Sequence, residues 1–198
     1  NYNVSYAEKI IPAADVSEQI STAGTEASGT SNMKFMINGA VTLGTLDGAN
    51  VEIRDRVGEE NMFLFGLHAD EAEALRAAGY DPQAYVRRSP WLGRVLERMS
   101  RGYADGESYA DLVSSLLYGG DPYLLLADFD DYAATHERLY TTIADPAVRA
   151  RLSLVNIARS GIFAADRSIA DYADTIWHVP YKNCLLYTSP SPRDRSLS

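Results

Sequence analysis

The 198-residue sequence contains a single cysteine, Cys184, which falls among its last residues. Residues 1–183 therefore hold no thiol, which excludes disulfides, zinc–thiolate sites and cysteine catalysis from that part of the chain. Apolar runs long enough to span a membrane are absent, and the first residues lack the pattern of a signal peptide. The GxxxxGK[ST] spacing of nucleotide-binding P-loops is absent as well.

Positive charge is scarce. The chain has 18 Lys and Arg against 27 Asp and Glu, a net charge of −9. Arg193 and Arg195 outweigh Asp194 near the end, so residues 1–183 are more acidic by one charge than the whole chain. An acidic chain is a poor nucleic-acid binder. We predict a soluble, cytoplasmic protein with no nucleic-acid or membrane partner, although Asn1 is not a natural start and a targeting segment upstream stays open.

The chain divides into two parts by composition. Residues 184–198 read Cys-Leu-Leu-Tyr-Thr-Ser-Pro-Ser-Pro-Arg-Asp-Arg-Ser-Leu-Ser, which resembles the conceptual translation of a sequencing-library adapter. The alternative is a natural disordered tail, since Ser and Pro without apolar periodicity fit that composition too. In either case residues 184–198 are expected to lie outside the fold. Residues 1–183, in a chain that is 46% hydrophobic, suit one domain with its own core.

Residues 1–183 show an α/β pattern, with helices dominating the carboxy-terminal half. Continuous or β-branched apolar runs predict strands, and apolar residues at helical spacing predict helices. The expected strands cover residues 3–10, 41–45 and 62–66, and the expected helices cover residues 32–38, 69–78, 82–101 with a break near Pro90, and about 129–143, 148–155 and 169–176. This alternation is typical of a parallel, doubly wound sheet, whose ligands bind beyond the carboxyl ends of the strands.

The stretch from residue 25 to residue 38 carries the most chemical information. Small and polar residues come first and can present free backbone N–H groups to an anion at the start of a helix. Lys34 follows between Met33 and Phe35, and a lysine desolvated by apolar neighbours offers a neutral amine that can attack a carbonyl. A phosphate cradle beside such a lysine suits pyridoxal phosphate. A nucleotide or a sugar phosphate fits the same residues, and so does an ordinary loop.

No metal site is expected. The three histidines, His68, His136 and His178, are too dispersed along the chain to share a metal ion. Asp128, Asp130 and Asp131 are expected to form a solvated face and a helix amino terminus.

The order of residues 26–38 resembles the pyridoxal-phosphate signature of the α-glucan phosphorylases, which act on glycogen, starch or maltodextrin. Residues 1–5, 7–21 and 39–52 resemble the same family, and weaker similarity continues to about Pro180. The chain departs from the signature at Ile37, where the family has Leu. The resemblance implies the carboxy-terminal, cofactor-bearing part of a retaining glycosyltransferase of the GT-B type, with two Rossmann-like lobes.

The resemblance also implies roles for individual residues. Lys34 would be the residue on which catalysis depends, because it would hold pyridoxal 5′-phosphate as a Schiff base. Thr30 and Ser31 would bind the cofactor phosphate through backbone N–H groups, and Tyr2 would lie close to the cofactor. The glucosyl unit would be contacted by Glu26, Ala27, Ser28 and Gly29. The partners would be α-1,4-glucan and inorganic phosphate, and the full-length protein would be a homodimer.

In this family the cofactor's phosphate, rather than its aldehyde, assists proton transfer, which suits a group with a second pKa of about 6. Two other hypotheses remain. One is a pyridoxal-dependent aminotransferase or decarboxylase, in which Lys34 would shuttle protons. The other is an inactive phosphate-binding module, because the amino-terminal lobe and the basic groups for substrate phosphate would precede Asn1.

Overall fold

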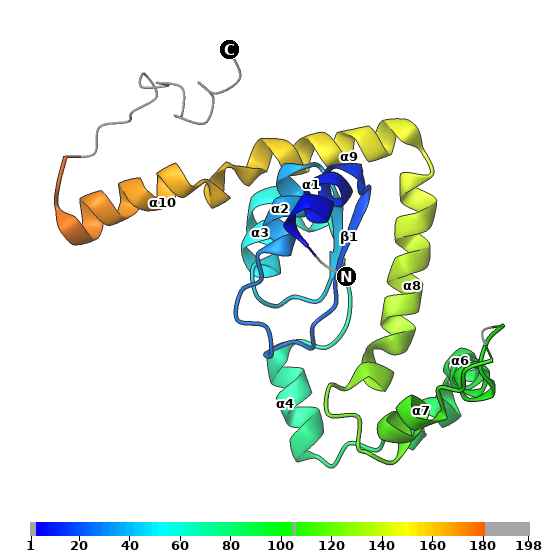
Figure 1. The fold of residues 1–198 in the computed structure, drawn as a ribbon. Helices are drawn as coiled ribbons and strands as arrows, with labels where there is room; N and C mark the ends of the chain where they lie inside the picture. Colours follow the sequence, from blue (N-terminus) through cyan, green and yellow to red (C-terminus); the bar gives the residue numbers. More distant parts are fainter. Residues whose placement is uncertain (1–2, 105, 181–198) are drawn as a thin grey trace. The chain divides into compact units, whose positions relative to one another are not determined.

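The computed structural model describes residues 3–104 and 106–180, so Tyr2 and residues 184–198 lie outside the part described. By its internal contacts the chain divides into two compact units, residues 1–160 and residues 161–198. The first unit contains the sheet and most of the helices, as Figure 1 shows.

A three-stranded parallel sheet organises the first unit. It consists of β1 (Val16–Gln19), β2 (Val41–Gly44) and β3 (Phe63–Leu64), in the order β1-β2-β3. Val16 pairs with Val41, and Leu43 pairs with Phe63. Each parallel pair needs a crossover connection, which α2 (Ser31–Ile37) supplies between β1 and β2, and α3 (Asn50–Val57) between β2 and β3. The helix-rich α/β fold expected from the sequence is confirmed.

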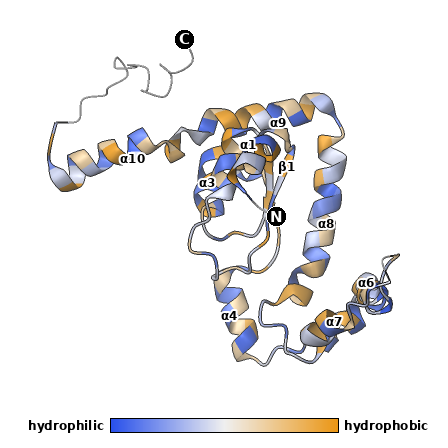
Figure 2. Ribbon diagram, in the orientation of Figure 1, coloured by the Kyte–Doolittle hydropathy of each residue, from blue (hydrophilic) through white to orange (hydrophobic). Residues whose placement is uncertain are grey.

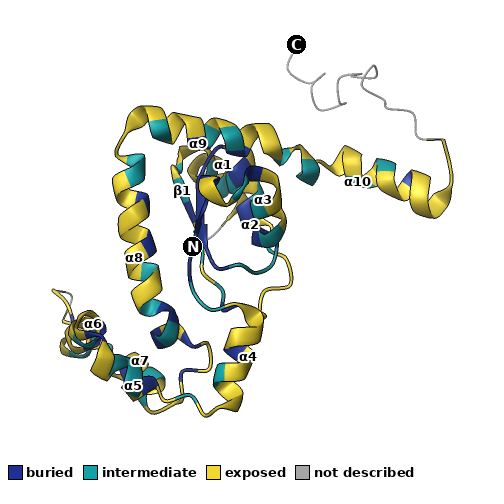
Figure 3. Ribbon diagram, turned by 180° about the vertical axis from the view of Figure 1, so that it is seen from behind, coloured by how far each residue is buried: buried dark blue, intermediate teal, exposed yellow. Residues whose placement is uncertain are grey.

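The main core lies between this sheet and two long helices, α8 (Leu125–Ile143) and α9 (Pro146–Arg159). All four residues of β2 are buried, as expected for a strand covered on both faces. Figure 3 shows the buried residues gathered on the strands, while the helices turn many exposed residues outward. The buried residues of this core are Val41, Leu43, Phe63, Phe65, Leu139 and Leu152.

The predicted strand over residues 3–10 is wrong, because this segment forms helix α1 (Val4–Ala13). Asn3 caps the helix by accepting a hydrogen bond on Oδ1 from the backbone N–H of Tyr6, at 2.9 Å. The good helix formers in the middle of the segment then outweigh its β-branched residues. The first strand lies later, at β1, and neither β1 nor α3 is predicted from the sequence.

The other predicted elements of the first unit are present. The expected break near Pro90 separates α5 (Pro82–Arg88) from α6 (Pro90–Arg101). Ser89 accepts the backbone N–H of Leu92 on Oγ, and Pro90 occupies the first turn of α6. Helix α7 (Ala110–Leu117) is present but is not predicted from the sequence. The remaining helices of this unit, in chain order, are η1 (Glu59–Asn61), α4 (Ala69–Ala77), α5 (Pro82–Arg88), α6 (Pro90–Arg101) and α7 (Ala110–Leu117).

A second apolar cluster joins α6, α7 and the start of α8. Its buried members are Leu92, Leu96, Val113 and Leu126. Figure 2 shows the alternation of hydrophobic and hydrophilic residues along these helices. This spacing buries one face of each helix and leaves the other in solvent, which is the pattern that predicted α6 and α8 from the sequence.

The second unit is helical over its described residues. It contains α10 (Ala165–Tyr172) and a π-helical turn, η3 (Ala173–Trp177). The Arg167 side chain donates a hydrogen bond to the carbonyl of Ile162 at 2.6 Å and pairs with Asp171 one turn along the helix. The helical spacing expected around residues 169–176 is therefore confirmed. In the described parts of the chain, no helix has the length and apolar character needed to cross a membrane.

Candidate functional site

The loop between β1 and α2 carries the four residues expected to contact sugar. It begins at the carboxyl end of β1, where ligands of parallel sheets bind. Glu26, Ala27 and Ser28 are exposed, and Gly29 is half-buried with a φ of +81°. The structure therefore places these side chains on an accessible edge, next in the chain to the start of α2.

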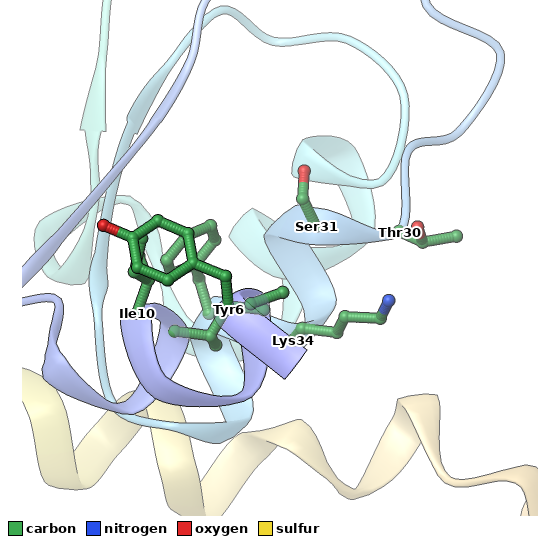
Figure 4. Close-up of a pocket in the computed structure, with 8 residues that line it drawn as sticks. Tyr6, Ile10, Thr30, Ser31 and Lys34 are labelled. Carbon is green, nitrogen blue, oxygen red and sulfur yellow. The ribbon is translucent and has the colours of Figure 1, made fainter. Parts of the chain in front are cut away.

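The amino end of α2 offers backbone N–H groups. Thr30 is the residue that precedes the helix, and its carbonyl accepts the N–H of Lys34 at 3.3 Å. Within residues 3–104 and 106–180, no hydrogen bond involves the backbone N–H of Thr30, Ser31 or Asn32. The Ser31 hydroxyl donates to Oε1 of Gln19 at 3.3 Å and, as Figure 4 shows, points away from Lys34. Backbone N–H groups, rather than this hydroxyl, are available to an anion.

Lys34 lies in a pocket of about 380 Å³ between α1 and α2, shown in Figure 4. Thr30 and Ser31 also line the pocket, and Tyr6 and Ile10 of α1 form part of its apolar wall. Lys34 and Thr30 are four residues apart, so they share one side of the helix. The structure thus brings together three of the residues predicted to bind the cofactor.

The expected desolvation of Lys34 by its apolar neighbours is wrong for this chain, because Lys34 is exposed. Residues one or two positions apart on a helix point in different directions. Met36 accordingly turns into the core, where it is fully buried, while the lysine side chain extends along the pocket. The pocket also does not include Glu26, Ala27, Ser28 or Gly29.

A buried pair of asparagines ties α2 to the end of β2. The Asn32 amide donates to Oδ1 of Asn50 at 3.2 Å, and the Asn50 amide donates to the carbonyl of Thr45 at 2.9 Å. Both asparagines are only 3% exposed. Buried polar groups of this kind hold a fixed geometry because leaving one unpaired is costly. The helix that carries Lys34 is therefore fixed to the sheet.

Residues 45–49, after β2, hold the loop that follows β1. The carboxylate of Asp47 accepts the backbone N–H groups of Thr25 and Glu26, and the N–H of Ala49 donates to the carbonyl of Ser28 at 2.7 Å. The sequence indicated only a turn at Asp47 and Gly48. The carboxyl ends of adjacent parallel strands lie at the same edge of a sheet. The position of residues 45–49 just after a predicted strand could therefore have linked them to the candidate site.

The three aspartates of α8 do not form a simple solvated face. Asp128 is buried and accepts the backbone N–H of Leu67 at 2.9 Å, and burial raises the pKa of its carboxyl group. Asp131 accepts the N–H of Gly66 at 2.7 Å. The expected helix amino terminus is confirmed for Asp128, which lies in the first turn of α8, but the expected solvated face is wrong for it, because its buried carboxylate fixes the loop after β3. Across the part of the chain that the structure describes, no three His, Cys, Asp or Glu side chains are arranged to hold a metal ion.

Comparison with known proteins gives consistent results. A family model described as carbohydrate phosphorylase matches residues 1–179. The chain is 47% identical over 187 residues to a glycogen phosphorylase of Chlamydia pneumoniae, covering 93% of this chain and 23% of that protein. It is 48% identical over 182 residues to the muscle forms of glycogen phosphorylase of Homo sapiens and Oryctolagus cuniculus, covering 90% of this chain and 22% of each relative. The chain thus spans less than a quarter of the length of these relatives. With the match covering nearly all of its described residues, the chain belongs to the carbohydrate phosphorylase family.

Proposed function

We propose that this chain is the cofactor-bearing part of an α-glucan phosphorylase, which cleaves α-1,4-linked glucose with inorganic phosphate and releases glucose 1-phosphate. The observation that carries the proposal is that free backbone N–H groups at residues 30–32 lie within one helical turn of the amine of Lys34. This arrangement occurs in a chain of the carbohydrate phosphorylase family. The proposal includes a two-lobed, doubly wound architecture, a homodimeric full-length protein and a cytoplasmic location.

The residues present fit pyridoxal 5′-phosphate. Three consecutive N–H groups at the start of α2 match a phosphate, and an accessible amine at Lys34 matches an aldehyde. The apolar side chains of Tyr6 and Ile10 give the pocket a wall against which an aromatic ring can pack. When bound, the cofactor supplies a phosphate that exchanges a proton near neutral pH, since its second pKa is about 6.

Two neighbouring groups of residues then have separate roles, one in binding the cofactor and the other in binding the glucosyl unit. Lys34 anchors the cofactor, and the N–H groups of Thr30 and Ser31 orient its phosphate and favour the anionic form. The loop of Glu26, Ala27, Ser28 and Gly29 binds the glucosyl unit, because carboxylate and backbone groups pair with sugar hydroxyls through directional hydrogen bonds. Glu26 is itself steadied by the Ser21 hydroxyl, which donates to Oε2 at 3.3 Å.

The site supports binding of the cofactor by this chain alone more directly than it supports catalysis by this chain alone. Lys34, Thr30 and the sugar-binding loop are exposed, and a water-accessible site weakens every electrostatic contact that the reaction needs. We propose that the 198-residue chain binds the cofactor without producing glucose 1-phosphate. A phosphate-binding module without activity is therefore the second candidate for the chain by itself.

The anchor can be tested on the 198-residue chain, which contains only three lysines, Lys9, Lys34 and Lys182. Incubation with pyridoxal 5′-phosphate, reduction with borohydride and peptide mapping should label Lys34. Lys34→Ala should lose the label, whereas Lys9→Ala, on the exposed side of α1, should keep it. Labelling of Lys9 or Lys182 in place of Lys34 would show that the assignment is wrong.

The reaction can be tested by exchanging residues 1–179 for the matching segment of the full-length Chlamydia pneumoniae relative. Reduction of the link to Lys34 should leave substantial phosphorolysis, because the aldehyde takes no part in the chemistry. Pyridoxal without its phosphate should bind and support no turnover. Complete loss of phosphorolysis on reduction, with the cofactor still bound, would instead favour an aminotransferase-like use of Lys34.

A further inference from the structure

Asp47 lies three residues after the end of β2 and is half-buried. One oxygen of its carboxylate, Oδ2, accepts two consecutive backbone N–H groups, from Thr25 at 3.1 Å and from Glu26 at 2.8 Å. A charged acceptor makes both bonds stronger than bonds between neutral groups. Two consecutive donors aimed at one atom fix the orientation of the peptide that joins Thr25 to Glu26.

The other end of the same stretch is held by the residues that follow. The backbone N–H of Ala49 donates to the carbonyl of Ser28 at 2.7 Å. Gly48 has a φ of +52°, and a Cβ placed there would lie 2.5 Å from the Ser28 carbonyl oxygen and 2.9 Å from Cγ of Glu26. Only glycine permits this approach. Residues 47–49 therefore hold residues 25–28 at both ends, without Asp47 lining the pocket of Lys34.

We propose that Asp47 is a positioning residue for the sugar-binding loop, an inference that rests on the function proposed above. Asp47 fixes the position of the Glu26 backbone and thereby the direction of the Glu26 side chain. Ala49 fixes the position of the Ser28 backbone. Glu26, Ala27 and Ser28 are exposed and make few side-chain contacts of their own, so the backbone anchors determine where their polar groups point. Lys34 depends on the separate Asn32–Asn50 pair.

Two variants of Asp47 separate positioning from general stability. Asp47→Ala removes the carboxylate that accepts the Glu26 N–H and one of the two acceptors of the Thr25 N–H, which also donates to the Thr22 carbonyl at 3.1 Å. Asp47→Asn keeps an oxygen that can accept both groups while removing the charge. Because a hydrogen bond to a charged group contributes about a tenfold to hundredfold factor, Asp47→Ala should lower kcat/KM for glucan by about that much. Asp47→Asn should recover most of this loss.

The test uses the exchanged full-length enzyme described above, with Asp55→Ala as the matched control. Asp55 is an exposed carboxylate on α3 that pairs with Arg54. In Asp47→Ala the KM for glucan should rise and the affinity for glucose 1-phosphate should fall. Cofactor content and melting temperature should stay close to those of Asp55→Ala. Equal loss of cofactor, thermal stability and glucan affinity would mean that Asp47 is merely structural, and would overturn the inference.

The proposed function and the inference fail in different ways. If the enzyme with unaltered Asp47 shows no phosphorolysis, the proposed function fails. If that enzyme is active and Asp47→Ala matches Asp55→Ala in every glucan parameter, only the inference fails. Amide hydrogen exchange on the 198-residue chain gives a readout free of activity. The N–H of Glu26 should exchange about tenfold faster or more in Asp47→Ala, and the N–H of Thr25 should change less because it also donates to the Thr22 carbonyl. Unchanged exchange at both amides would refute the proposed anchoring.

Discussion

The Asn32–Asn50 pair offers the sharpest test of what fixes the helix that carries Lys34. In Asn50→Ala the amide of Asn32 loses its acceptor inside the protein, which costs about 1–3 kcal/mol. The Thr45 carbonyl loses the Asn50 amide but keeps the backbone N–H of Asp47 at 3.0 Å, so its loss is only about 0.5–1.5 kcal/mol. Together these terms predict a fall of about 1.5–4.5 kcal/mol in the free energy of unfolding.

Urea unfolding of the 198-residue chain, followed by circular dichroism, measures this fall as a shift in midpoint at constant slope. Asn38→Ala is the matched control, because the Asn38 amide donates to the Lys34 carbonyl at 2.9 Å from an exposed position. It should change stability by no more than about 0.5 kcal/mol. A loss below about 1 kcal/mol for Asn50→Ala would refute the reasoning, because it would mean that water replaces both bonds.

Three further predictions concern the rest of the first unit. Leu152→Ala should cost about 2–5 kcal/mol in urea unfolding because Leu152 is 1% exposed, whereas Leu154→Ala, 66% exposed on the same helix, should cost less than about 0.5 kcal/mol; similar values would contradict the assigned core. Gly39→Ala should lower the melting temperature, since φ is +85° and the added Cβ would collide with Ser153; an unchanged melting temperature would disprove this close approach. Burial raises the pKa of Asp128, so the native protein binds more protons than the unfolded chain just above the ordinary carboxyl pKa of about 4. Stability relative to Asp128→Asn should therefore fall as the pH rises from about 4, and a relative gain would contradict the sign.

The fold was predictable where the sequence pattern depends on local burial. The apolar run over residues 62–66 predicted the strand β3, and the break near Pro90 predicted two helices, because both signals need no distant partner. Strand β1 was missed because Val16–Gln19 has little apolar character and forms its ladder against β2, in register with residues 41–44. Helix α1 was missed because the side chain of Asn3 decides where it begins.

The candidate site was predictable only as a local group of residues. Thr30, Ser31 and Lys34 occur within five positions, so a single stretch of sequence suggested them, and the structure places all three in one pocket. The role of Asp47 was not visible, because its hydrogen-bond partners lie 21 and 22 residues earlier in the chain. Only the pairing of β1 with β2 brings these segments to the same edge.

The two halves of the site differ in how firmly they are held, and this bears on how each responds to mutation. The α2 half is fixed by the buried asparagine pair and by the fully buried Met36. The loop of residues 26–29, which we propose to bind sugar, is largely exposed and is fixed mainly through backbone groups that contact Asp47 and Ala49. Segments with few buried contacts open at a lower free-energy cost than core segments. Substitutions at Asp47 should therefore affect the proposed sugar binding well before they affect the proposed anchoring at Lys34, because the helix that carries Lys34 depends on the Asn32–Asn50 pair and not on Asp47.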